Sequence, residues 1–236
     1  MNLNVILWDF DGTLAHRDGM WSGALTSLAQ QIFPENEVTA DAIRPHLQSG
    51  FPWHSPEADY GQRSSEQWWS DLEPVFYNAY KNAGLPHEYS MRLSQSVRNE
   101  YTQSENWAVY DDVEDCLSGL ISKGWQHHIL SNHVPELPKL VRALGLGDYF
   151  KQIFTSAKIG FEKPNESIFK HVLSTLPKKC NVWMVGDSYA ADILGAETVG
   201  IPAILVRKQH HSAKYSCPSL AGVSGIVNQR TFQQNG

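Results

Sequence analysis

Short apolar runs alternate with helix-like segments along the second half of the chain, and this alternation constrains the fold more than any other feature. The apolar runs fall near residues 125–130, 150–155, 181–185 and 202–206, and a further one opens the chain at residues 3–8. Helical patterns lie near residues 112–122, 135–144, 165–176 and 189–198. Apolar runs of this length that stop at turn residues are typical of buried parallel strands. Repeated strand–helix units therefore predict an α/β fold, with a doubly wound parallel sheet between two layers of helices.

Residues 15–105 have a different, helical character. Apolar residues recur there every three or four positions, and no stretch alternates like a strand. Ser64 and Gln67 have the spacing of a capping box at the start of a helix. A segment of this length is too long for an ordinary loop. We therefore expect an α-helical cap domain, residues 15–105, inserted into a core domain made of residues 1–14 and 106–236.

Composition narrows the possible partners and locations. The net charge is −6, from 25 acidic and 19 basic residues, and no Lys/Arg-rich run indicates nucleic-acid binding. The three cysteines form no C-x-x-C pair, so neither a disulfide framework nor a zinc site is expected. No apolar run approaches the ~20 residues that span a bilayer, and the first residues do not resemble a secretion signal. We therefore expect a cytoplasmic protein with no nucleic-acid or membrane partner, and the sequence leaves the oligomeric state open.

Polar residues follow the predicted strands at the points where the strands end. In open α/β sheets, ligands bind outside the carboxyl ends of the strands. The polar residues found at these ends, or in the loops beside them, are Asp9, Asp11, Ser131, Asn132, Lys163, Asp187 and Asp192. Because the carboxyl ends of parallel strands meet at one edge of a sheet, we expect these side chains to form one site.

The acidic residues of this set suit a magnesium ion, which prefers hard oxygen ligands. Asp9 and Asp187 can each supply a carboxylate oxygen, and Asp11 can supply its backbone carbonyl oxygen. Asp192 either ligates the ion, directly or through water, or orients Lys163. The expected metal ligands are therefore Asp9, Asp11, Asp187 and Asp192.

The same set of residues suits phosphoryl transfer. A carboxylate such as that of Asp9 can attack phosphorus and form a covalent intermediate, and Asp11 can act as the acid and the base. Lys163 can stabilise charge on the transferred group. We expect Lys163, Ser131 and Asn132 to hold the phosphate oxygens. The alternatives are helix capping for Ser131 and a structural role for Asn132.

Four motifs resemble those of a known family. They are D-F-D-G-T-L from Asp9, S-N from Ser131, G-F-E-K-P-N-E-S-I-F around Lys163 and G-D-S-Y-A-A-D-I-L-G-A from Gly186. In order and spacing they resemble the haloacid dehalogenase-like (HAD) hydrolase superfamily across essentially the whole core. An insertion directly after the first motif resembles the helical cap of subfamily I. Asn165 stands where the family often has aspartate, and we expect little effect on the chemistry.

The resemblance implies a Rossmann-like core and a Mg²⁺-dependent phosphatase. Its substrate would be a small phosphorylated metabolite, hydrolysed through an aspartyl-phosphate on Asp9. A phosphomutase is one alternative. A 2-haloacid dehalogenase is another, but the family's dehalogenases lack the second aspartate of the first motif, whereas Asp11 is present. A binding protein without catalysis is disfavoured because all the motifs are intact.

Several further residues have both a structural and a functional interpretation. We expect cap tryptophans such as Trp21 and Trp69 to pack within the cap, and a contact with the substrate is the alternative. Arg17, where the chain enters the cap, could meet a second anionic group of the substrate. His127 and His128 lie within a predicted strand, and we expect them to pack in the core.

Overall fold

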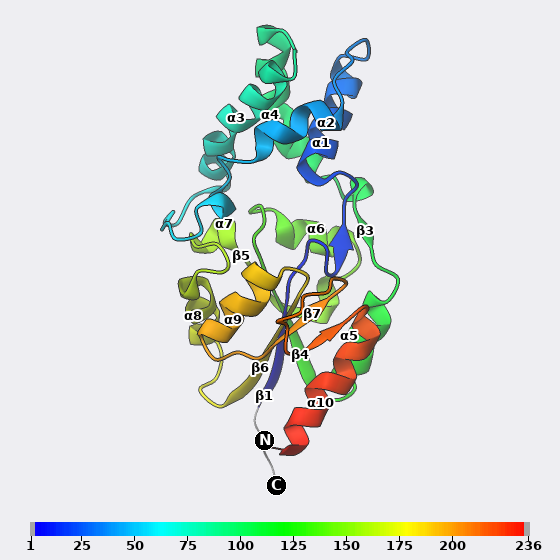
Figure 1. Ribbon diagram of the computed structural model, residues 1–236, viewed down its shortest axis with the longest axis vertical. Helices are drawn as coiled ribbons and strands as arrows, with labels where there is room; N and C mark the ends of the chain where they lie inside the picture. The colour runs from blue at the N-terminus through cyan, green and yellow to red at the C-terminus, as the bar shows by residue number, and fades with distance from the viewer. Residues whose placement is uncertain (1–2, 234–236) are drawn as a thin grey trace.

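The computed structural model describes residues 3–233, and a twisted parallel sheet forms the centre of the core (Figure 1). Within these residues, six strands pair in the order β5-β4-β1-β6-β7-β8, and neighbouring strands are parallel. They are β1 (Leu3–Trp8), β4 (Trp125–Ser131), β5 (Phe150–Thr155), β6 (Cys180–Gly186), β7 (Ala203–Val206) and β8 (Ser216–Cys217). Strand β1 lies between β4 and β6: Leu7 pairs with His128 on one side and with Met184 on the other. The expected α/β fold is confirmed.

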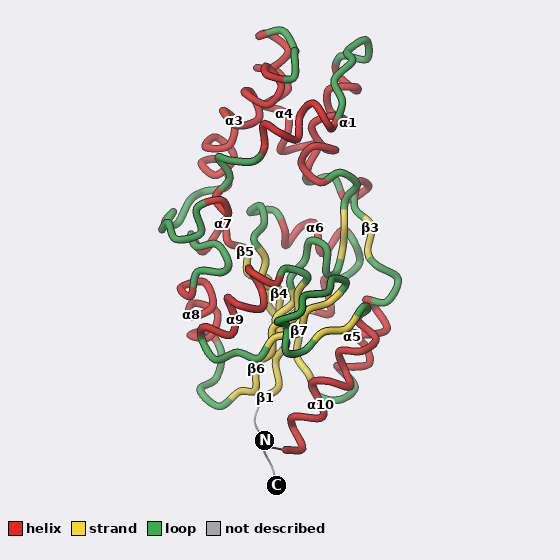
Figure 2. Tube along the Cα trace, viewed as in Figure 1, coloured by secondary structure: helices red, strands yellow, loops and turns green. Residues whose placement is uncertain are grey.

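Helices cover both faces of this sheet (Figure 2). Ile6 and Trp8 belong to one hydrophobic cluster and Val5 and Leu7 to the other, because successive side chains of a strand point to opposite faces. The first cluster includes residues of α5 (Val113–Ile121), α6 (Leu137–Ala143) and α10 (Val223–Gln233). The second includes residues of α8 (Glu166–Thr175) and α9 (Gly195–Thr198), and the short α7 (Ser156–Ile159) follows β5. Among residues 3–233, no helix is both long and apolar enough to cross a membrane.

The cap is built from helices that lie beyond the carboxyl ends of the strands (Figure 1). They are α1 (Met20–Ile32), α2 (Ala40–Ile43), α3 (Ser65–Asn82) and α4 (His87–Tyr101). The capping box forms as expected: Gln67 N donates to Ser64 Oγ at 3.1 Å, and Ser64 N donates to Gln67 Oε1 at 2.9 Å. The grouping of these helices supports our proposed division into a cap and a core.

The structure corrects the expectation that the cap segment contains no strand. Strand β2 (Ala15–His16) pairs antiparallel with β3 (Ala108–Val109), where the chain enters and leaves the cap. A strand of two residues is too short to show a periodic pattern. The helix expected from residue 189 also differs, because it begins as a π-helical turn, Tyr189–Leu194, before α9.

A carboxylate of the core accepts hydrogen bonds from α3 and α4 of the cap. Glu136, directly before α6, accepts hydrogen bonds from Ser65 Oγ at 2.5 Å, Trp69 Nε1 at 3.0 Å and Arg98 Nη2 at 2.7 Å. Ser65 and Trp69 belong to α3, and Arg98 belongs to α4. The side chain of Glu136 is only 11% exposed, so these bonds are partly shielded from water. Glu136 therefore fastens the cap to the core.

We expect Glu136→Ala to loosen this attachment. The change leaves the Ser65, Trp69 and Arg98 donors without their acceptor, which costs about 3 kcal/mol for a partly buried, charge-assisted network. Amide hydrogen exchange in α3 should then accelerate by up to about 10²-fold. Glu66→Ala is the matched control, because Glu66 is an exposed partner of the same arginine at 3.6 Å and such pairs contribute little. Equal acceleration in both variants would show that Glu136 does not fasten the cap.

Candidate active site

The predicted site residues come together at the carboxyl edge of the sheet. Asp9 follows β1, Ser131 ends β4 and Asp187 follows β6, so three adjacent strands contribute. After β1 the chain adds β4 and β5 on one side and then returns to add β6 and β7 on the other, and such a switch point leaves a crevice for ligands. A cavity of about 590 Å³ lies here. Its lining includes every expected residue: Asp9, Asp11, Ser131, Asn132, Lys163, Asp187 and Asp192.

Three carboxylates of the site converge closely. Oxygen atoms of Asp9, Asp187 and Asp192 all lie within 4.8 Å of one another. Two glycines leave room for them: a Cβ at Gly12 would lie 2.5 Å from Asp187 Oδ2, and a Cβ at Gly186 would overlap the carboxylate of Asp192. Gly12 also has a φ of 73°, in the left-handed region that glycine adopts without strain. The two glycines of the motifs therefore leave the space that the carboxylates of Asp187 and Asp192 occupy.

The ammonium group of Lys163 lies between two of these carboxylates. Its Nζ donates to Asp9 Oδ1 at 2.8 Å and to Asp192 Oδ1 at 2.5 Å, and the side chain is buried. Burial lowers the pKa of Lys163, but the charges of Asp192 and Asp9 outweigh burial and raise it, so the group stays protonated. This contact favours the interpretation in which Asp192 orients Lys163.

Asn132 and Ser131 differ in the hydrogen bonds that their side chains make. Asn132 Nδ2 donates to the backbone oxygen of Lys163 at 2.9 Å, and Asn132 Oδ1 accepts from the backbone N–H of Lys163 at 2.7 Å. These bonds favour the structural role for Asn132, and its contact with phosphate stays a prediction. Ser131 Oγ is buried, and it makes no hydrogen bond within the described part of the chain. A buried hydroxyl without a partner is costly, and a phosphate oxygen would satisfy it.

Asp11 lies beside a histidine that the sequence reasoning missed. His133 Nε2 is 3.5 Å from Asp11 Oδ1, and both residues line the cavity. Burial, reinforced by the charges of Asp9 and Asp187, raises the pKa of Asp11 well above its ordinary value. Burial lowers the pKa of His133 to about 4, so its ring is neutral. Asp11 is thus suited to carry a proton. The position of His133, two residues after the end of β4, is the sequence signal that could have identified it as a site residue.

The cap supplies the apolar side of the cavity. Its contributions are Met20, Trp21, Trp53, Pro56 and Tyr101. Trp21 also packs within the cap, with its ring centroid 3.7 Å from that of Tyr101, so it meets the structural expectation and lines the cavity as well. Trp69 is buried in the cap and donates to Glu136, as expected of a structural residue.

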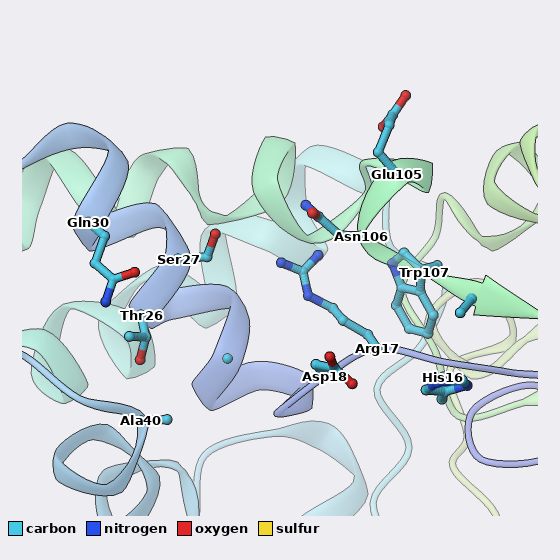
Figure 3. A pocket seen from close by; sticks show the side chains of 12 residues that line it. His16, Arg17, Asp18, Thr26, Ser27, Gln30, Ala40, Glu105, Asn106 and Trp107 are labelled. Atoms are coloured by element: carbon cyan, nitrogen blue, oxygen red, sulfur yellow. The ribbon is translucent and has the colours of Figure 1, made fainter.

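Arg17 does not line this cavity, so the structure gives no support to the hypothesis that it meets a second anionic group. Its Nη1 donates to the backbone oxygen of Glu100 at 2.9 Å, and its Nη2 donates to Glu100 Oε1 at 2.6 Å. It lines a separate polar cavity of about 550 Å³, where its guanidinium points toward Asn106 (Figure 3). Asn106 Nδ2 also donates to Glu100 Oε1, at 3.1 Å. Arg17 therefore anchors the base of the cap.

The two histidines of β4 pack in the core, as expected. Trp8 Nε1 donates to His127 Nδ1 at 3.0 Å, and burial lowers the pKa of His127 to about 4. His128 is also buried, and its ring stacks with that of Phe154 at 6.2 Å.

The acidic cluster fits a hard divalent cation. Its donors are all oxygen atoms, which are the ligands that Mg²⁺ prefers. Burial and repulsion from Asp9 raise the pKa of Asp187 by more than Lys208, whose Nζ lies 2.6 Å from Asp187 Oδ2, and Lys163 lower it. A bound cation would supply the missing positive charge.

Sequence comparisons match this chain to a family model and to named relatives. Residues 3–200 match a family model described as hydrolase, haloacid dehalogenase-like hydrolase. The chain is 30% identical to haloacid dehalogenase-like hydrolase domain-containing protein 3 of Mus musculus, over 61% of this chain and 57% of that protein, so it spans just over half of that relative. It is 37% identical to the glyceraldehyde 3-phosphate phosphatase of Methanothermobacter thermautotrophicus, over 42% of this chain and 45% of that protein.

A solved structure is similar over nearly the whole chain. The magnesium-bound putative HAD-hydrolase YfnB of Bacillus subtilis aligns with a TM-score of 0.74 and 23% identity, over 97% of this chain and 100% of that one. At this level of identity, the structural similarity shows that the two chains share a fold. Since the family model covers most of the chain, the chain belongs to the haloacid dehalogenase-like hydrolase family.

Proposed function

We propose that this chain is a Mg²⁺-dependent phosphatase that hydrolyses a small phosphorylated metabolite through an aspartyl-phosphate on Asp9. The observation that carries the proposal is the convergence of Asp9, Asp187 and Asp192 within 4.8 Å, with Lys163 bonded to two of them. The similarity to a protein named as a glyceraldehyde 3-phosphate phosphatase supports phosphate-ester hydrolysis as the reaction.

In the proposed reaction Asp9 is the nucleophile and Asp11 is the acid. Lys163 holds Asp9 Oδ1 at 2.8 Å, which leaves the other carboxylate oxygen of Asp9 to attack phosphorus. As the new O–P bond forms and the bond to the leaving oxygen breaks, Asp11 gives its proton to that oxygen. Ser131 Oγ and Lys163 Nζ donate to the non-bridging oxygens, where negative charge gathers.

The second half of the reaction releases inorganic phosphate. Water attacks the phosphorus of the aspartyl-phosphate, and Asp11 takes the proton of that water. The O–P bond to Asp9 breaks, and the Asp9 carboxylate is restored. Magnesium, when bound, offsets charge on the phosphoryl oxygens. Asp9, Asp187 and the Asp11 backbone carbonyl would hold the ion, with Asp192 as a ligand directly or through water.

Phosphate release should therefore require a divalent cation. With benzyl phosphate as the substrate, a chelator should slow release by at least about 10²-fold, because the charge stabilisation worth several kcal/mol is lost. Added Mg²⁺ should restore the rate. Chloride release from 2-chloropropionate in the presence of the chelator would instead favour the dehalogenase alternative. Transfer of phosphate between substrate molecules without free phosphate would favour the mutase.

We also propose a cytoplasmic location. Cys116, Cys180 and Cys217 are free thiols, which fits a reducing compartment.

A further inference from the structure

The catalytic cavity has a charged floor and an uncharged wall. The floor holds the acidic cluster and Lys163, where the phosphoryl group would bind. The wall consists of Met20, Trp21, Trp53, Pro56, Tyr101 and Val134. Among the described residues that line the cavity, Lys163 alone carries a permanent positive charge, and it lies between Asp9 and Asp192. The part of the cavity that would receive the leaving group therefore offers no countercharge for an anion.

Three arginines of the cap are paired with acidic side chains outside the cavity. The pairs are Arg17–Glu100 at 2.6 Å, Arg63–Asp71 at 2.9 Å and Arg98–Glu136 at 2.7 Å. None of these arginines is among the described residues that line the cavity. A carboxylate or a second phosphate on the leaving group would thus lose its water against apolar side chains without gaining a partner, which is costly. The wall selects against anionic leaving groups.

The aromatic residues of the wall are held in place by one another. The rings of Trp21 and Tyr101 stack at 3.7 Å with an interplanar angle of 7°. Phe76 also stacks on Trp21, at 5.5 Å, and the ring of Trp53 lies at 6.0 Å from that of Trp21 with an angle of 29°. Because Trp21 is fixed by these neighbours, little conformational freedom is lost when a planar group packs against it.

The cavity is larger than a phosphoryl group requires. Its volume of about 590 Å³ lies within the range of roughly 300–1,000 Å³ that is usual for small-molecule sites. The room beyond the floor faces the aromatic wall. We propose that the substrate is a phosphomonoester whose leaving group is uncharged and carries an aromatic ring. This inference rests on the phosphatase activity proposed above and adds the chemical class of the leaving group.

Three matched esters test the proposal on the unmodified protein with Mg²⁺. Benzyl, cyclohexylmethyl and 4-carboxybenzyl phosphate all release primary alcohols of similar acidity, so differences in kcat/KM report mainly on binding of the leaving group. We expect kcat/KM for benzyl phosphate to exceed that for 4-carboxybenzyl phosphate by at least about tenfold and that for cyclohexylmethyl phosphate by about threefold. A 4-carboxybenzyl ester that reacts as well as the benzyl ester would overturn the proposal. If no phosphate ester reacts at all, the phosphatase assignment itself fails, which is a different result.

A positive charge placed on the wall should weaken or remove the preference for the benzyl ester. Met20→Lys keeps a long unbranched side chain, which suits the φ of 47° at this position, and Met20→Gln is the uncharged control. In Met20→Lys, the ratio of kcat/KM for the carboxybenzyl ester to that for the benzyl ester should rise by about tenfold or more, chiefly through KM. Met20→Gln should keep the preference for the benzyl ester. An unchanged ratio in a folded Met20→Lys protein would show that this wall does not select the leaving group.

Discussion

Asp9→Asn abolishes phosphate release in the proposed mechanism. The amide oxygen of asparagine is a far weaker nucleophile than a carboxylate, and no aspartyl-phosphate can form. The substitution keeps the size of the side chain, so the cavity and the Lys163 contact change little in shape. We expect the rate to fall by at least about 10⁴-fold, which is the scale seen when a covalent nucleophile is removed.

The measurement should detect the covalent intermediate as well as the rate. An aspartyl-phosphate reacts with hydroxylamine, so the unmodified protein quenched during turnover should give a hydroxamate at Asp9, and Asp9→Asn should give none. Asp148→Asn makes the same chemical change at an exposed position and should leave the rate unaltered. Full activity in an Asp9→Ala protein would contradict the covalent mechanism.

Asp11→Asn should have the second largest effect, because it removes the group that carries the proton in both half-reactions. Loss of a general acid or base typically costs 10²–10⁴-fold, and we expect a loss of about this size with benzyl phosphate. The asparagine still supplies a backbone carbonyl oxygen, so a ligand role of that oxygen is kept. The loss therefore reports on proton transfer rather than on the metal.

A substrate that needs no acid separates this role from a general defect. 4-Nitrophenol leaves readily as an anion, so the first turnover with 4-nitrophenyl phosphate should fall by much less in Asp11→Asn than the first turnover with benzyl phosphate. The phosphorylated protein should then accumulate, because its hydrolysis lacks the base. An equal loss with both substrates in the first turnover would show that Asp11 does not protonate the leaving oxygen.

Much of the core could be predicted from sequence because its signals are local. The apolar run of β1 ends at Asp9, and the run of β6 ends directly before Asp187, so strand ends and site residues coincide along the chain. Parallel strands must bring their carboxyl ends to the same edge, which is why these residues were expected in one place. Short elements gave no such signal, as β2 (Ala15–His16) illustrates.

Contacts between distant residues could not be predicted in this way. Arg17 looked available for a substrate anion, but Glu100, 83 positions away, accepts from its guanidinium. Glu136 lies at the start of a segment that the sequence predicts as helical, with nothing to mark it out, yet it accepts from donors on α3 and α4. Both interactions depend on how the cap helices pack against the rest of the chain, which no periodic pattern records.

The sequence by itself determined which residues gather at the candidate site, from Asp9 and Asp11 to Lys163 and Asp187, because covalent spacing and strand direction carry that information. Only the tertiary structure decided which neighbours surround these residues and shift their pKa values. It brought His133 to Asp11, and it stacked Trp21 of α1 on Tyr101 of α4 above the charged floor. Burial and charge depend on every neighbour in space, so the nature of the leaving group could be inferred only after the cap had been placed.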